Sequence, residues 1–408
     1  MKVTMVIPSY WGRKKSEGWK ETDAVYDHPT PLDEQGILGR ALESISILEK
    51  TDFNLVILGV STARDIQQEV ESKVSSVVKE SMTGVKTHFF SYSHLAKIHR
   101  HLTAFNLEKY IPLLQLNGYS NIRNLCIFLP HLLGSDVAVL IDDDEIFEDP
   151  RFMEKALEFI GREYQKEKVL AVAGYYINPD NDFLLNTDIP PWMTYWNKID
   201  CMNRAFKEII GKGPRLKETP FVFGGNMVVH RDLFTVVPFD PMVTRGEDID
   251  FLINARMFGF TFYLDNQLSI KHDAPPKTHP EWQKLREDIS RFVFEKNKLE
   301  SQEPTPGMAR LKAENLDPYP GEFLKEDLQD RIFHSNLMLA IDYLSQGDNE
   351  GAQECLNNIS AAKASSNPGT NPFKDLLHLQ KTWKDLMEYF SSEKVRLEIS
   401  SQIGFGSE

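Results

Sequence analysis

Short apolar, β-branched segments alternate with helical segments over the first 275 residues, and this alternation constrains the fold more than any other feature. Strands are expected at 3–8, 53–59, 87–92, 136–141, 168–176, 221–229, 260–265 and 268–272. Helical periodicity lies between them, at 64–80, 117–134 and 248–258, and Asp33 is the expected N-cap of a helix with an apolar face of Leu38, Leu42, Ile45 and Leu48. Strands joined by helices form sheets that are covered on both faces. The sequence therefore predicts an α/β fold with a parallel or mostly parallel sheet.

The composition changes after this region. Residues 276–325 are expected to form a connecting helix and a linker whose prolines are Pro304, Pro306, Pro318 and Pro320. Residues 326–408 carry repeated helical patterns, including one with Trp383 and Phe390, and predict a small helical bundle. The expected division is thus 1–275, 276–325 and 326–408. If Trp383 and Phe390 were exposed they would form a costly apolar surface, so homo-oligomer formation through these helices is also expected.

Charge and cysteine usage restrict the function. A net charge of −14 argues against a nucleic-acid-binding protein, which needs a basic surface to neutralise phosphates. The 3 cysteines are scattered and predict neither a zinc site nor a disulfide framework. No apolar run approaches the about 18 residues that cross a bilayer, and the N-terminus lacks the features of a signal peptide. We expect a soluble cytoplasmic protein without an integral membrane segment.

The acidic run Asp142-Asp143-Asp144-Glu145 is the strongest indication of chemistry. It follows the buried strand at 136–141 directly, and ligands of open α/β sheets bind outside the carboxyl ends of the strands. Carboxylate oxygens suit Mg²⁺ or Mn²⁺, which complete their coordination with substrate phosphates and water. A metal site is therefore expected, and the alternative is a solvated acidic turn.

Several short motifs occur in a characteristic order around this run. They are VIPSY in the first strand, Gly118-Tyr119-Ser120-Asn121-Ile122-Arg123-Asn124, VLIDDDE, Phe223-Gly224-Gly225-Asn226-Met227, Gly246-Glu247-Asp248 and Lys271-His272. Together they resemble the GT-A glycosyltransferases, particularly family 2, over about residues 1–275. The resemblance implies a Rossmann-like nucleotide-diphospho-sugar transferase domain, followed here by the C-terminal helical region.

The resemblance also implies roles for single residues on the side of the sugar donor. Asp142 and Asp144 correspond to the Asp-x-Asp pair that binds the donor ribose and the metal, and Asp143 lies between them. Pro8, Ser9 and Tyr10 would border the nucleotide base. Arg123 would contact the diphosphate or, alternatively, form an ion pair with the acidic run.

Further residues are implied near the transferred sugar and the acceptor. Gly224, Gly225 and Asn226 would let the backbone approach the sugar, unless they form a simple turn. Asp248, with Glu247 beside it, would take the proton from the acceptor hydroxyl, the alternative being a helix cap. His272 would be a further metal ligand or a structural histidine.

The function that follows is a metal-dependent transfer of a sugar from a nucleotide-diphospho-sugar to a hydroxyl of a small molecule or soluble glycan, with inversion and Asp248 as the base. The rival hypotheses are a sugar-phosphate nucleotidyltransferase and a non-catalytic sugar-binding or scaffold protein. The nucleotidyltransferase would need a Gly-rich basic loop after the first strand, and Gly12-Arg13-Lys14-Lys15 lacks the repeated glycines. Trp192, Tyr195 and Trp196, within residues 188–200, are candidates for a lid or surface that packs against the acceptor, or for a seal between the two parts of the chain.

Overall fold

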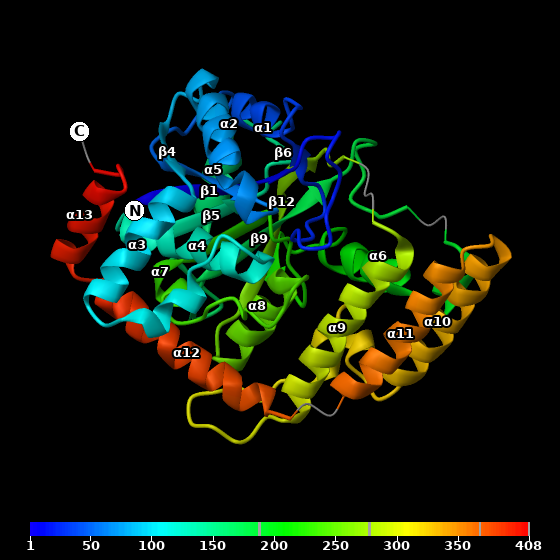
Figure 1. The fold of residues 1–408 in the computed structure, drawn as a ribbon. Helices are drawn as coiled ribbons and strands as arrows, with labels where there is room; N and C mark the ends of the chain where they lie inside the picture. Colours follow the sequence, from blue (N-terminus) through cyan, green and yellow to red (C-terminus); the bar gives the residue numbers. More distant parts are fainter. Residues whose placement is uncertain (187–188, 276–278, 367–368, 407–408) are drawn as a thin grey trace.

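A mixed β-sheet forms the centre of the molecule (Figure 1). The computed structural model describes residues 1–186, 189–275, 279–366 and 369–406. The strand order is β10-β12-β9-β11-β5-β1-β3-β4. These strands are β1 (Val3–Gly12), β3 (Asn54–Ser61), β4 (Lys86–Phe90), β5 (Val137–Ile141), β9 (Ala171–Ile177), β10 (Leu216–Glu218), β11 (Asn226–His230) and β12 (Phe262–His272).

The pairing confirms the expected α/β class with a mostly parallel sheet. Strands β5, β1, β3 and β4 are parallel to one another, whereas β11 runs antiparallel to both β5 and β9. Two short strands extend the sheet, because β2 (Thr30–Pro31) pairs with β1 and β6 (Glu145–Ile146) pairs with β12. The pair β7 (Glu163–Tyr164) and β8 (Glu167–Lys168) forms a separate hairpin. The acidic run follows β5, a central strand, at its carboxyl end, and its last residue, Glu145, begins β6.

Alternate residues of the strands face two hydrophobic layers. Met5 and Ile7 of β1 pack with helices α1 (Leu38–Ile45), α2 (Gln67–Glu80) and α5 (Phe152–Glu158). Val6 and Tyr10 face the other layer, which includes α3 (Tyr92–Ala104), α4 (Tyr119–Leu132) and α8 (Glu247–Met257). Side chains of successive strand residues point to opposite faces, so one apolar strand contributes to both layers.

Further helices and short 3-10 turns complete the part of the chain before residue 326. The helices are α6 (Lys198–Ile209), α7 (Arg231–Phe234) and α9 (Glu281–Glu300). Short 3-10 turns are η1 (Arg64–Ile66), η2 (Glu108–Leu113), η3 (Pro191–Thr194), η4 (Ala313–Leu316) and η5 (Gly321–Phe323).

Among the differences from the expected boundaries, three change how an element is understood. The strand expected at 221–229 begins only at Asn226, because residues 221–225 have irregular backbone that leads into the site. The strands expected at 260–265 and 268–272 form the single strand β12, with an irregularity between Leu264 and Ser269. The prediction of Asp33 as an N-cap was wrong, since α1 begins at Leu38 and Asp33 accepts the Lys15 N–H instead at 3.0 Å.

The C-terminal region is helical, as expected, and packs directly on the α/β part. It contains the hairpin α10 (Leu328–Ser345) and α11 (Asn349–Ser365), then α12 (Pro372–Tyr389) and α13 (Glu393–Gln402). In Figure 1, α12 runs along the α/β part and leads to α13 near α3. Residues 276–278, where the expected connector begins, lie outside the described residues, and the division into 1–275, 276–325 and 326–408 stays a prediction.

Trp383 and Phe390 are fully buried, so the argument for self-association from their exposure was wrong. Trp383 Nε1 donates a hydrogen bond to the Phe234 carbonyl at 2.8 Å, and Phe390 packs edge-on against Phe128 with ring centroids 4.9 Å apart. The helical pattern alone could not distinguish an apolar face that covers the sheet domain from one that binds a second copy. Homo-oligomer formation stays a prediction without this support.

The aromatic residues near position 190 act mainly as a seal. Trp192 and Trp196 are buried, and the Trp196 ring lies 4.9 Å from that of Phe323 and 5.9 Å from that of Phe292. Tyr195 remains exposed. Residue 188, where the expected segment begins, lies outside the described residues.

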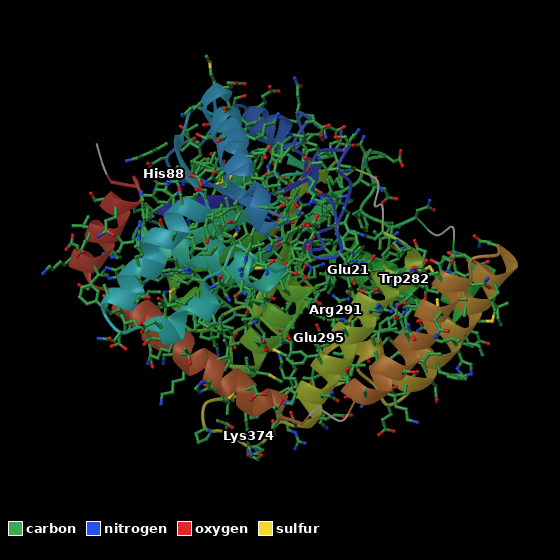
Figure 2. All side chains as sticks on the ribbon, in the orientation of Figure 1. Glu21, His88, Trp282, Arg291, Glu295 and Lys374 are labelled. Atoms are coloured by element: carbon green, nitrogen blue, oxygen red, sulfur yellow. The ribbon has the colours of Figure 1, made fainter. Side chains whose placement is uncertain are left out.

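Helix α9 carries charged side chains into the interior, toward α8. Lys298 Nζ donates to Asp250 Oδ1 at 2.6 Å, and both residues are fully buried. Arg291 and Glu295 lie on the same helix and are also buried (Figure 2). The N-terminal part of α8, which carries Glu247 and Asp248, is therefore supported by a charged layer beneath it.

Candidate active site

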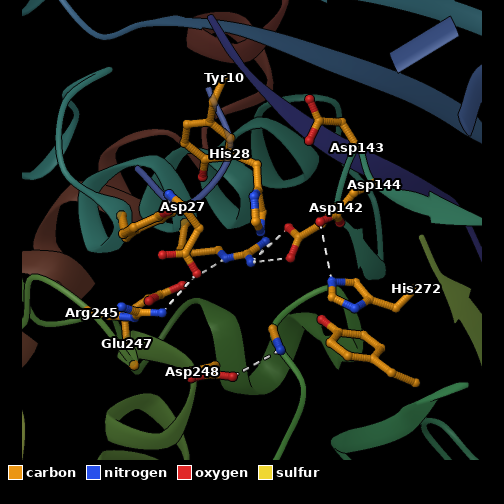
Figure 3. Close-up of a pocket in the computed structure, with 15 residues that line it drawn as sticks. Tyr10, Asp27, His28, Asp142, Asp143, Asp144, Arg245, Glu247, Asp248 and His272 are labelled. Carbon is orange, nitrogen blue, oxygen red and sulfur yellow. Dashed lines mark hydrogen bonds and ion pairs between the residues drawn. The ribbon is translucent and has the colours of Figure 1, made fainter. Parts of the chain in front are cut away.

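An open cavity of about 290 Å³ lies where the carboxyl end of β5 meets the start of α8 (Figure 3). The described residues that line it are Tyr10, Asp27, His28, Tyr119, Arg123, Asp142, Asp143, Asp144, Tyr176, Gly224, Arg245, Gly246, Glu247, Asp248 and His272. Most of the residues expected at the site therefore meet in one place, although they come from segments far apart in the sequence.

The acidic run turns sharply after β5 and brings three carboxylates together. Oxygen atoms of Asp142, Asp144 and Glu145 all lie within 4.8 Å of one another. Glu145 Oε2 accepts the Asp142 N–H at 3.0 Å, whereas its buried Oε1 has no hydrogen-bond partner among the described residues. Burial raises the pKa of Glu145 well above its ordinary value, and the neighbouring Asp142 and Asp144 raise it further. Sequence reasoning had omitted Glu145 from the metal ligands, although it is the fourth acid of the run.

These residues fit a hard divalent cation. Carboxylate oxygens are the ligands that Mg²⁺ and Mn²⁺ prefer, and a cation would offset the repulsion within the cluster. The orphaned Oε1 of Glu145 supplies a buried oxygen for that purpose. The alternative of a solvated acidic turn is disfavoured, because Asp143 and Glu145 are buried.

Arg123 of α4 joins the two acidic segments of the site. Its Nη2 lies 2.8 Å from Asp142 Oδ1, and its Nε donates to Glu247 Oε1 at 3.1 Å. Burial would lower the pKa of Arg123, but Asp142 and Glu247 raise it well above its ordinary value. Arg123 thus forms an ion pair with the acidic run, one of the two roles expected for it, and also lines the cavity, while its contact with the diphosphate stays a prediction.

The two glycines leave space that a side chain would fill. A Cβ at Gly224 would lie 2.9 Å from Arg123 Nη2, and one at Gly225 would lie 2.6 Å from Asp142 Oδ2. Their N–H groups also donate hydrogen bonds, Gly224 to Asp248 Oδ2 at 3.0 Å and Gly225 to the Tyr176 hydroxyl at 2.8 Å. The pair therefore does more than form a simple turn, since it lets the backbone approach the acidic cluster closely.

Glu247 and Asp248 are the first residues of α8. Gly246 precedes them with a φ of 73°, a left-handed conformation that favours glycine. Asp248 Oδ2 accepts the Gly224 N–H, and its Oδ1 accepts the Ile249 N–H at 2.8 Å, so the carboxylate is held at the cavity wall. Burial and the neighbouring Asp248 raise the pKa of Glu247 to about 7, against the opposing effect of Arg123.

His272 ends β12 beside the acidic run. Its Nε2 lies 3.2 Å from Asp144 Oδ2, and its ring stacks on Tyr176 with centroids 4.8 Å apart. Burial would raise the pKa of Asp144, but the interaction with His272 lowers it below its ordinary value. The arrangement orients one ring nitrogen toward the cluster, where it could join the carboxylates as a ligand.

Some of the predicted site residues do not line the cavity. The described lining residues do not include Pro8, Ser9, Gly225 or Asn226. Ser9 is buried and hydrogen-bonds Asp143. Asn226 is also buried, and its side-chain amide donates to the Tyr175 and Leu268 carbonyls at 3.2 and 3.0 Å. Asn226 therefore ties neighbouring strands together, and its expected part in letting the backbone approach the sugar stays a prediction.

Other lining residues were not predicted. Asp27 and His28 come from the long loop after β1, and Arg245 directly precedes Gly246. Arg245 Nη2 donates to Asp27 Oδ2 at 2.9 Å, and Arg245 Nη1 donates to Glu287 Oε2 at 2.8 Å. The Asp27 N–H donates to the Tyr119 hydroxyl at 2.6 Å. The unusual length of the loop between residues 11 and 32 was the only signal in the sequence for this part of the wall.

Among the described residues, no helix combines the length and the apolar character that a bilayer crossing requires.

No family model matches the chain, and no curated protein matches it.

Three solved structures illustrate what the chain is similar to. The mannosyltransferase PcManGT from Pyrobaculum calidifontis, in complex with GDP-Man and Mn²⁺, is 13% identical, and the match covers 97% of this chain and 87% of that one with a TM-score of 0.43. A mycobacterial protein is 15% identical over 71% of this chain and 74% of its own, with a TM-score of 0.37. The apo form of mouse xyloside xylosyltransferase 1 is 15% identical over 65% of this chain and 78% of its own, with a TM-score of 0.29. Two of these three structures are glycosyltransferases.

Proposed function

We propose that this protein transfers a sugar from a nucleotide-diphospho-sugar to a hydroxyl group of an acceptor, on a domain of the GT-A type. The observation that carries the proposal is the meeting of two acidic segments across one cavity. Asp142, Asp144 and Glu145 are suited to hold a divalent cation, Mg²⁺ or Mn²⁺, and Asp248 lies on the α8 side of the same cavity. A cation bound there would act as a Lewis acid that offsets the charge of the departing nucleoside diphosphate.

The proposed reaction is a displacement at the anomeric carbon, with Asp248 as the base. Asp248 accepts the proton of the acceptor hydroxyl, whose oxygen forms the new bond to the anomeric carbon. The bond from that carbon to the phosphate oxygen breaks, and the electron pair leaves with the nucleoside diphosphate. Attack from the side opposite the leaving group inverts the anomeric centre. A positioned carboxylate base contributes about 10²–10⁴-fold to such a rate.

Positioning is the role of the other buried groups. Arg123 fixes Asp142 and Glu247 relative to each other through its two ion pairs. The Gly224 N–H holds one Asp248 oxygen, and each carboxylate oxygen has a second lone pair with which it can accept a further hydrogen bond. His272 orients Asp144 from the opposite side.

Calorimetric titration of nucleoside diphosphates and their sugars, with and without Mn²⁺, tests the proposal. Metal-dependent binding of one nucleotide is expected for the wild type and for Asp330→Ala, a control on the exposed side of α10. The binding should be lost in Asp144→Ala. If no nucleotide binds in the presence of metal, the transferase is refuted in favour of a non-catalytic protein. Release of pyrophosphate from a nucleoside triphosphate and a sugar phosphate would instead identify a nucleotidyltransferase.

A further inference from the structure

We propose that the acceptor is an uncharged, hydroxyl-rich molecule, such as a neutral sugar or glycan, and not a phosphorylated or carboxylated one. The inference rests on the proposed function, because it concerns the part of the same cavity that surrounds Asp248. We call this part the acceptor wall and define it as Asp27, Arg245, Glu247 and Asp248. All four line the cavity, and Figure 3 shows them on the side away from Asp143 and Asp144.

The cations of the cavity are already paired with carboxylates. Arg245 donates one nitrogen to Asp27 and another to Glu287, at 2.9 and 2.8 Å. Arg123 is held in the same way between Asp142 and Glu247. These are the guanidinium groups among the described lining residues, and no lysine is among them. His28 and His272 add charge only when they are protonated. An anionic acceptor would therefore have to displace a carboxylate from an arginine.

The remaining charge of the cavity disfavours a second anion. In the described lining, carboxyl groups outnumber guanidinium groups, six to two: Asp27, Asp142, Asp143, Asp144, Glu247 and Asp248 against Arg123 and Arg245. The excess remains, four to two, when Asp143 and Glu247 are left out because burial raises their pKa. The sugar donor brings a negatively charged diphosphate of its own, which would share the cation of the acidic run. Neutral sugars avoid this repulsion, since their hydroxyl groups donate hydrogen bonds that ionised carboxylates can only accept. Placing like charges side by side reduces affinity by about a hundredfold or more.

The test compares acceptors that differ by one anionic group. Glucose, mannose, their methyl glycosides and maltose would be paired with the 6-phosphates and uronates of the same sugars. Transfer would be measured from the nucleotide sugar that binds in the calorimetric assay, and hydrolysis of that sugar donor without acceptor would report on the donor half of the site. We expect kcat/KM for a neutral acceptor to exceed that for its anionic counterpart by about a hundredfold or more.

Either of two results would overturn the inference while leaving the proposed function intact. One is equal or faster transfer to the anionic member of a pair. The other is donor hydrolysis without transfer to any neutral member. Failure of the proposed function is distinguishable, since no nucleotide sugar would then bind or be hydrolysed.

A substitution on the acceptor wall tests the physical cause. Asp27→Asn removes one negative charge but keeps an oxygen that can accept from Arg245, so the preference for neutral acceptors should fall about tenfold. Asp330→Asn makes the same charge change on the exposed face of α10 and should leave the preference unchanged. An unaltered preference in Asp27→Asn would show that the wall does not cause it and would refute the inference.

Discussion

Glu295 provides the most direct test of the electrostatics beneath the site. It is fully buried on α9, and neither carboxyl oxygen has a hydrogen-bond partner among the described residues. The pKa of Glu295 is raised from 4.5 to about 8, chiefly by burial; Asp250 and Asp248 add to the increase, and Arg291 and Lys298 oppose it. The folded protein therefore keeps this proton in a pH range where the unfolded chain has released it. The contribution of Glu295 to the free energy of unfolding is therefore greatest below pH 4.5 and is lost progressively as the pH rises toward 8.

The size of the effect follows from the two pKa values. The difference between about 8 and 4.5, at 1.36 kcal/mol per pKa unit, corresponds to about 5 kcal/mol as an upper limit. Glu295→Gln replaces the carboxyl by a neutral group of similar shape and removes the titration. The free energy of unfolding of this variant should match that of the wild type near pH 5 and exceed it by several kcal/mol near pH 8.

Urea unfolding followed by circular dichroism between pH 5 and 8.5 measures this difference. Glu300→Gln, at an exposed position of the same helix, is the matched control and should follow the wild type at every pH. If wild type and Glu295→Gln have the same pH dependence, the carboxyl is not held neutral by burial and the reasoning is refuted.

Three further substitutions probe the site and the packing around it. Gly225→Ala should abolish metal-dependent nucleotide binding in calorimetry, because its Cβ would overlap Glu145 Oε1. Gly39→Ala, whose Cβ would enter open space, should bind normally. Normal binding by Gly225→Ala would contradict the close approach of the backbone to the acidic run. Asp248→Asn should lower kcat by about 10²–10⁴-fold in a transfer assay with unchanged nucleotide affinity; full activity would exclude Asp248 as the base. Trp383→Ala should lower the free energy of unfolding by about 3–5 kcal/mol in urea titrations, because a large buried side chain is lost. A decrease below about 1 kcal/mol would argue against tight packing of α12 on the α/β part.

The sequence by itself determined the features that depend on local pattern. Apolar runs between helical segments predicted the α/β class, because a buried strand and an amphipathic helix each have their own periodicity. The acidic run was predicted at a strand end and Asp248 at a helix start, since each lies beside the element that positions it. From these positions a common site at the edge of the sheet could be expected.

The tertiary structure decided what depends on contacts between distant segments. Asp27 and Arg245 meet although 218 residues separate them, and no periodicity in the loop after β1 indicates that contact. Asn226 stands in a motif expected to let the backbone approach the sugar, and only the assembled sheet shows that its side-chain amide donates to strand carbonyls on β9 and β12. Trp383 lies on an apolar helix face that fits a core or an interface equally well. Its hydrogen bond to the Phe234 carbonyl, across 149 residues, belongs to the core, because only the assembled fold brings that carbonyl within reach.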